Sequence, residues 1–178
     1  IYPLMIMVTL ASIILYKPLL NSTDLFFNLT GLFGIFKWDT YYATGIWSIG
    51  NELTFYLVFP ILLYGTRGSG NLFYILFFLF FAISIYFSLS IIPLEPVNYW
   101  RDYINPLNQI IYFSIGILIG KVFERKKLST FTSASLLILS LLLFTFYPTS
   151  PDKVDIISGL DRYVLSICCA IIVASLLF

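Results

Sequence analysis

Six stretches of the chain are almost entirely apolar, and shorter segments that hold most of the polar residues separate them. A helix needs about 20 apolar residues to cross a bilayer core of about 30 Å, and these stretches reach or approach that length. The stretches that we expect to be membrane helices are residues 1–16, 47–65, 71–91, 106–122, 130–147 and 162–178. The predicted fold is therefore all-α, a polytopic transmembrane helix bundle.

A further apolar segment, residues 22–36, is too short to span a membrane and is interrupted by Gly31 and Gly34. Ser22 or Thr23 is a candidate helix cap, because a side-chain oxygen at that position accepts a hydrogen bond from a free backbone N–H group. We expect this segment to lie along the outer leaflet or to dip into it.

The amino-acid composition indicates whether the surface of the folded protein faces water or lipid. Of the 178 residues, 60% are hydrophobic and only 11% are charged. A soluble domain is about one quarter charged, so this chain has too few charges to cover a surface that faces water. We expect an integral membrane protein with lipid as its main partner. The formal net charge of +1 and the scattered basic residues argue against a nucleic-acid partner.

The two ends of the chain, Ile1 and Phe178, both lie inside apolar runs. We therefore expect residues 1–178 to form a single transmembrane domain that is an internal piece of a longer protein. The sequence leaves the oligomeric state open.

Histidine is absent from the chain, and its two cysteines, Cys168 and Cys169, are adjacent. Histidine catalysis and the common metal motifs need histidines or spaced cysteines, so we expect no metal site and no bound cofactor within this chain. Any histidine chemistry must come from residues outside it.

The loop charges predict an orientation. Basic residues are densest in the short connections 66–70 and 121–129, while the long connections 17–46, 92–105 and 148–161 carry few. The positive-inside rule places the short connections and the N-terminus in the cytoplasm. Aromatic residues that suit the outer interfacial belt are Trp38, Tyr41, Tyr42, Trp47, Tyr99, Trp100 and Tyr103.

Glu52 lies about one turn inside the outer end of its predicted helix. Ser48, Glu52 and Tyr56 recur every four residues and share one helix face, and Asn51 lies beside them. One interpretation is that the helix macrodipole favours a glutamate in a first turn. The other is functional, because an ionisable side chain at membrane depth usually faces a polar cavity or a partner.

A second polar stripe enters the membrane from the same side, formed by Asn105, Asn108, Gln109 and Tyr112. Interhelical hydrogen bonds that hold the bundle together would explain it equally well. Two stripes at matching depth predict a wet, outward-opening pocket. Gly116 and Gly120 continue the second stripe at a spacing that permits close helix contact, and Pro60 is expected to kink its helix.

The segment WSIGNELTFYLVFP, residues 47–60, resembles the signature of acyltransferase family 3. The residues that match are Trp47, Ser48, Glu52, Phe55, Tyr56, Leu57 and Pro60. IYPL at 1–4 resembles the end of the family's cytoplasmic basic motif, and NPLNQIIYFSIGILIG at 105–120 resembles a later helix. The family's first helices, with an Arg and His motif, and its last helices lie outside this chain.

The resemblance implies transfer of an acyl group, most often acetyl from acetyl-CoA, to a hydroxyl of a carbohydrate or lipid-linked glycan. It implies a bacterial inner-membrane enzyme of the O-antigen or exopolysaccharide acetylase type. The general base is the family's histidine. Glu52 would orient that histidine, neutralise its imidazolium or bind acceptor hydroxyls. The substrate-binding candidates are Ser48, Asn51, Tyr56, Asn108 and Gln109.

Two other interpretations stay open. A transporter or flippase would use Glu52 as an intramembrane carboxylate, although the further midplane charges and paired broken helices typical of that class are not visible. The other open interpretation is a structural fragment that has no activity of its own. Without the histidine helix, we expect the 178 residues alone to transfer no acyl group.

Overall fold

The computed structural model describes residues 2–66, 71–92, 98–124 and 128–177, and every regular element in those ranges is a helix. The predicted all-α fold is therefore confirmed. The elements, in chain order, are α1 (Tyr2–Tyr16), α2 (Ser22–Thr30), α3 (Phe33–Phe36), α4 (Ile46–Thr66), α5 (Asn71–Tyr86), the π-helical η1 (Phe87–Ile91), α7 (Tyr99–Tyr103), α8 (Pro106–Phe123), α9 (Thr130–Phe146), α10 (Lys153–Ser158) and α11 (Leu160–Ser175).

All six predicted membrane segments are helical, but their lengths differ. In the described part of the chain, three helical stretches are long and apolar enough to cross a membrane: Ile46–Thr66, Asn71–Ile91 and Tyr99–Phe123. The helices Tyr2–Tyr16 and Thr130–Phe146 are apolar but shorter, and α11 (Leu160–Ser175), in the sixth predicted segment, is in neither group. The basic residues 125–127 and Arg67, which set the predicted orientation, lie outside the described residues.

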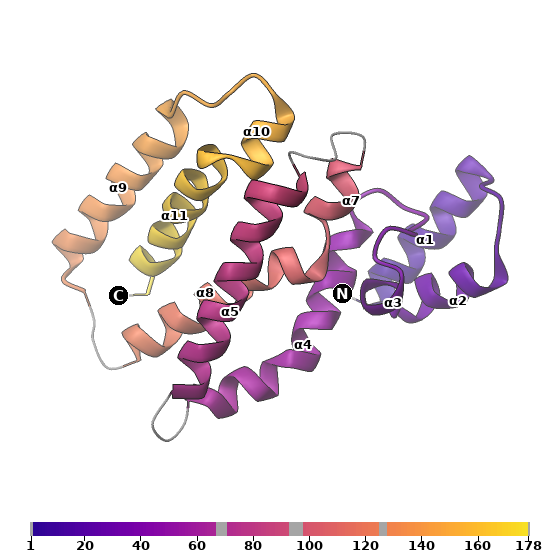
Figure 1. Ribbon diagram of the computed structural model, residues 1–178, viewed down its shortest axis with the longest axis horizontal. Coiled ribbons are helices and arrows are strands. Elements are labelled where there is room, and N and C mark those ends of the chain that lie inside the picture. The colour runs from indigo at the N-terminus through magenta and orange to yellow at the C-terminus, as the bar shows by residue number, and fades with distance from the viewer. Residues whose placement is uncertain (1, 67–70, 93–97, 125–127, 178) are drawn as a thin grey trace.

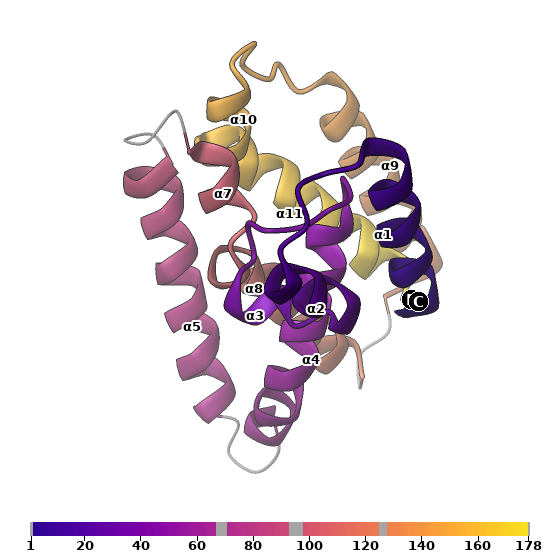
Figure 2. The ribbon, with the colours of Figure 1, turned by 90° about the vertical axis from the view of Figure 1, so that its right-hand side faces the viewer.

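The helices form a bundle around α4, α5 and α8 (Figure 1). Leu62, Phe73, Phe80, Ile110 and Ile111 fill the centre where these three helices meet. The pair α9 and α11 lies on one flank of the bundle, and α1, α2 and α3 lie on the other. Figure 2 shows α5 and α1 on opposite sides, with α4 between them.

A second apolar cluster joins the first three helices to α4. Met5, Phe33, Ala43 and Ile46 are buried together, and they come from α1, α3, the loop before α4 and the first residue of α4. Their burial holds the segment 22–36 against the start of α4, so the helix that carries Glu52 is fixed from this side.

Segment 22–36 forms two short helices separated at Gly31, whose φ of 75° is favoured by glycine and ends α2. The predicted cap is wrong by one residue. Asn21 caps α2, because its side chain accepts a hydrogen bond from the Thr23 N–H group, and Ser22 is already helical.

Helices α3 and α4 cross with their backbones in contact at two glycines. A Cβ atom on Gly34 would overlap the carbonyl group of Gly50, and a Cβ on Gly50 would lie 2.7 Å from the Phe33 ring and 3.0 Å from the Gly34 Cα. Only glycine fits at either position. The crossing therefore brings α3 close to the turn of α4 that precedes Glu52.

The predicted close contact at Gly116 and Gly120 is not found among the described residues. A Cβ atom on either glycine would meet no atom within 4 Å. The reason is that α8 and α11 touch near their first turns and leave a cavity between them farther along, which Gly116 lines.

Candidate functional site

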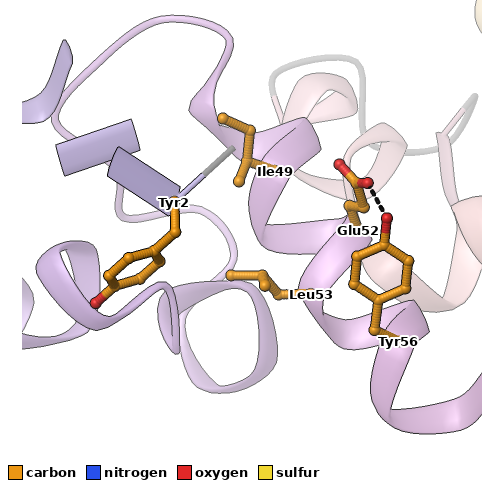
Figure 3. A pocket seen from close by; sticks show the side chains of 5 residues that line it. All are labelled: Tyr2, Ile49, Glu52, Leu53 and Tyr56. Atoms are coloured by element: carbon orange, nitrogen blue, oxygen red, sulfur yellow. Dashed lines mark hydrogen bonds between the residues drawn. The ribbon is translucent and has the colours of Figure 1, made fainter. Parts of the chain in front are cut away.

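Glu52 lies on α4, half-buried, with Tyr56 one turn farther along the same face. The Tyr56 hydroxyl donates a hydrogen bond to the Glu52 carboxylate, as Figure 3 shows. Both residues line a small cavity of about 40 Å³ together with Ile49, Leu53 and Tyr2 of α1, and Figure 3 shows Ile49 and Leu53 on the side of α4 that faces Tyr2. A carboxylate paired with a phenol offers one charged acceptor and one hydroxyl to a polar ligand.

The position of Glu52 weakens the dipole interpretation. The first turn of α4 contains no acidic residue, because the helix begins at Ile46 and Glu52 is six residues farther on. The favourable field of a helix N-terminus falls off within the first turn. Another interaction has to stabilise this carboxylate, and Tyr56 supplies one.

No ion pair of Glu52 with a basic side chain occurs among the described residues. The two ion pairs in those ranges join Lys37 to Asp24 and Arg101 to Asp39. The Glu52 charge is therefore available for a further donor or cation, which is the requirement for the predicted functional role.

Ser48 shares the exposed face with Glu52 and Tyr56, as predicted from the four-residue spacing. Its hydroxyl donates to the Gly45 carbonyl at 2.8 Å, in the turn before α4. Tyr56 is 50% exposed. In the described structure, this face of α4 is only partly covered.

Asn51 points away from that face and is buried. Its amide group donates to the Ile104 carbonyl at 3.0 Å and so joins α4 to the junction of α7 and α8. This contact is the structural link between the two polar stripes.

Asn108 and Gln109 turn toward the end of α7. The Asn108 amide donates to the carbonyls of Tyr103 and Asp102 at 3.0 and 3.3 Å, and the Gln109 amide donates to Tyr103 at 2.5 Å. Both side chains are buried. They satisfy backbone carbonyls at a helix end, which is the structural use of polar groups that the sequence left open.

The two polar stripes are joined by the bond from Asn51 to Ile104, but their other side chains point to different neighbours. The cavity beside Glu52 is lined by residues of α1 and α4, while the polar residues of α8 face α7 and α11. The outward-opening pocket expected from both stripes together is not formed by the described residues. The assignment of these side chains to substrate binding stays a prediction.

The sequence reasoning missed Arg162, which lies in the first turn of α11 and is only 4% exposed. Its guanidinium donates to the Tyr112 hydroxyl at 2.7 Å and to the Asn108 side-chain oxygen at 2.8 Å. A basic residue at the start of the predicted membrane segment 162–178 was the signal that could have found it.

Several of the predicted outer aromatic residues contact one another at the end of the bundle where α4 and α8 begin. Trp47, Trp100 and Tyr103 contact one another with ring centroids 5.5–6.1 Å apart. The Trp100 indole donates to the Tyr41 hydroxyl at 2.8 Å. These contacts fix the end of the bundle at which α4 and α8 begin.

The described residues include no group of three or more His, Cys, Asp or Glu side chains placed to hold a metal ion. Cys168 is buried and Cys169 is exposed, and both are free thiols.

A family model described as "Acyltransferase domain" matches residues 1–178, which is the whole length of the chain. The chain belongs to acyltransferase family 3, as the residues of α4 indicated. Searches of curated proteins and of solved structures returned no significant match. The family and the long apolar helices together define an integral membrane acyltransferase.

Proposed function

We propose that the protein is a membrane-embedded O-acyltransferase that moves an acyl group, most often acetyl, from acyl-CoA to a hydroxyl of a carbohydrate or lipid-linked glycan. The observation that carries the proposal is the half-buried Glu52 carboxylate. It lies within the family's Trp-to-Pro block, is hydrogen-bonded by Tyr56 and has no cationic partner in the described structure. The proposed location is a bacterial inner membrane.

In the proposed reaction, the acceptor oxygen attacks the thioester carbonyl carbon of acyl-CoA. A new C–O ester bond forms, the C–S bond breaks, and CoA leaves as a thiol that takes up the proton removed from the acceptor hydroxyl. The base is a histidine outside this chain, as the family resemblance implies. Glu52 either orients that base and stabilises its charged form or binds an acceptor hydroxyl, and Tyr56 holds the carboxylate in place.

The test supplies membranes that contain the full-length protein with labelled acetyl-CoA and glycan acceptor. We expect label in the glycan as an alkali-sensitive ester, together with one free CoA thiol for each ester formed. A transporter predicts a different result, which is unmodified glycan on the far side of the membrane and no release of CoA.

The proposed orientation places the connection between α8 and α9 in the cytoplasm. In a background of Cys168→Ala and Cys169→Ala, a cysteine introduced at Glu124 should react with an impermeant maleimide only after the membrane is opened. A cysteine at Asp152, before α10, should react in intact cells. The reverse pattern would contradict the orientation.

A further inference from the structure

Arg162 is a buried cation that the proposed reaction does not use. Besides its bonds to Tyr112 and Asn108, its Nη2 atom donates to the Ser84 hydroxyl at 3.3 Å and to the Asn108 carbonyl at 3.2 Å. All four acceptors are neutral. The contacts join α5, α8 and α11 around one positive charge.

In the described part of the chain, two donors at this place lack an acceptor, and the Arg162 charge contacts neutral groups, including the Tyr103 and Tyr112 rings at 6.0 and 5.5 Å. Arg162 forms no ion pair there with a carboxylate. The Arg162 Nη1 atom and the hydroxyl of its neighbour Tyr163 are both buried without a hydrogen-bond partner. Burying an unmatched cation and unmatched donors is costly, so an anionic acceptor is the natural complement.

A cavity adjoins this cluster between α5, α8 and α11. It has a volume of about 230 Å³, and four of its lining residues carry hydroxyls: Ser84, Tyr112, Tyr163 and Ser166. Three of these belong to the Arg162 cluster, because Ser84 and Tyr112 accept from the guanidinium and Ser166 donates to the Arg162 carbonyl at 2.6 Å. The remaining lining is apolar.

A second cavity, of about 380 Å³, continues from the first between α8 and α11. The two share Tyr112, Ile115, Ser166 and Ala170 in their linings. We call them together the α8–α11 groove. Its far part is lined by apolar side chains and by Gly116, where the absence of a side chain keeps the space open.

We propose that the α8–α11 groove binds an anionic phospholipid of the bilayer. The phosphate contacts Arg162 and Tyr163, and one acyl chain follows the apolar part of the groove past Gly116. Arginine is suited to phosphate because its guanidinium presents several donors in one plane. Arg162 itself lines neither cavity, and its Nη1 atom and the Tyr163 hydroxyl are closed to solvent, so binding of the phosphate requires side chains of the cluster to move.

The depth of the cluster supports a lipid of the bilayer as the occupant. Arg162 lies in the first turn of α11, which begins at Leu160, at the end of the bundle that holds α7 and α10 (Figure 1). Residues 162–178 are a predicted membrane segment, and on that prediction Arg162 lies near the lipid headgroups while the later turns of α11 lie beside the acyl chains. In the groove, likewise, the polar part lies at the start of α11 and the apolar part lies farther along the helix.

The experiment measures the lipid that stays bound to the full-length protein. The protein is extracted with mild detergent from vesicles of phosphatidylglycerol and phosphatidylcholine in equal parts, and native mass spectrometry counts the bound lipids. We expect wild-type protein to retain phosphatidylglycerol in preference to phosphatidylcholine. Arg162→Gln and Gly116→Leu should each weaken that retention about tenfold or more, by removing the charge and by filling the groove respectively.

Gly120→Leu is the matched control, because Gly120 lies on the same helix, is equally open and does not line the groove. It should retain phosphatidylglycerol like wild type. If Arg162→Gln fails to fold, Gly116→Leu still tests the proposal, because it fills the groove and leaves the Arg162 contacts intact. Wild-type protein that retains neither lipid, as expected if a protein helix fills the groove, would overturn the proposal. So would equal retention of both lipids, or the same loss in Gly116→Leu and Gly120→Leu.

Discussion

Replacing Glu52 with glutamine in the full-length protein is expected to lower glycan acylation by about 100- to 1,000-fold at unchanged protein levels. Glutamine keeps nearly the same volume and can still accept the hydrogen bond from Tyr56, so the main change is the loss of the charge. If that charge stabilises an imidazolium formed during transfer, its loss acts on the transition state and lowers kcat more than it raises KM.

The measurement is the initial rate of ester formation per amount of membrane-inserted protein. Glu124→Gln is the matched control, because Glu124 is an exposed carboxylate at the end of α8, far along the chain from the site. It should acylate like wild type. Tyr56→Phe removes the hydroxyl that holds Glu52 and should give a smaller loss. A fully active Glu52→Gln protein would exclude a role for the carboxylate charge in acyl transfer.

The helical fold was predictable because apolar length alone selects a membrane helix. All six predicted segments are helices, and their bounds lie within a few residues of the expected ones. The cap of α2 was misplaced because Asn21, Ser22 and Thr23 are all good capping residues, and sequence alone does not show which one leaves the helical conformation.

The face that carries Ser48, Glu52 and Tyr56 was also predictable, because a four-residue spacing fixes a face whatever the surroundings. The direction in which that face points in the folded protein could not be predicted from the sequence. It depends on the rotation of α4 against α3 and α8, which is set by the Gly34–Gly50 crossing and by the bond from Asn51 to Ile104. For that reason the two polar stripes were expected in one pocket, whereas the structure directs them to different neighbours.

Two polar centres result from this rotation. Glu52 and Tyr56 share a small cavity with Tyr2 of α1, while Arg162 of α11 contacts Tyr112 of α8. Asn51 and the aromatic contact between Trp47 and Tyr103 connect the two regions at one end of the bundle. A half-open negative centre and a closed positive centre differ in the ligands they can bind, which agrees with the separate proposals of acyl transfer at the first and lipid binding at the second.

Gly34→Ala and Gly50→Ala are each expected to lower the free energy of unfolding by about 1 to 3 kcal/mol. The added Cβ at Gly34 overlaps the Gly50 backbone, and the added Cβ at Gly50 meets the Phe33 ring and the Gly34 Cα. The Gly50 backbone cannot give way like a flexible side chain, and the Phe33 ring is fully buried, so α3 has to move off α4 in either variant. Since Gly50 precedes Glu52 by two residues, acylation should fall as well.

The midpoint of thermal unfolding of full-length protein in detergent, followed by fluorescence-detected size exclusion, tests this expectation. Gly120→Ala is the control, because it makes the same substitution in a helix where a Cβ meets no neighbour. Alanine is the better helix former by up to about 1 kcal/mol, so this variant should be at least as stable as wild type. If Gly34→Ala and Gly50→Ala matched Gly120→Ala, helices α3 and α4 would not be in backbone contact. The rotation of α4 that sets the direction of the Glu52 face would then need another cause.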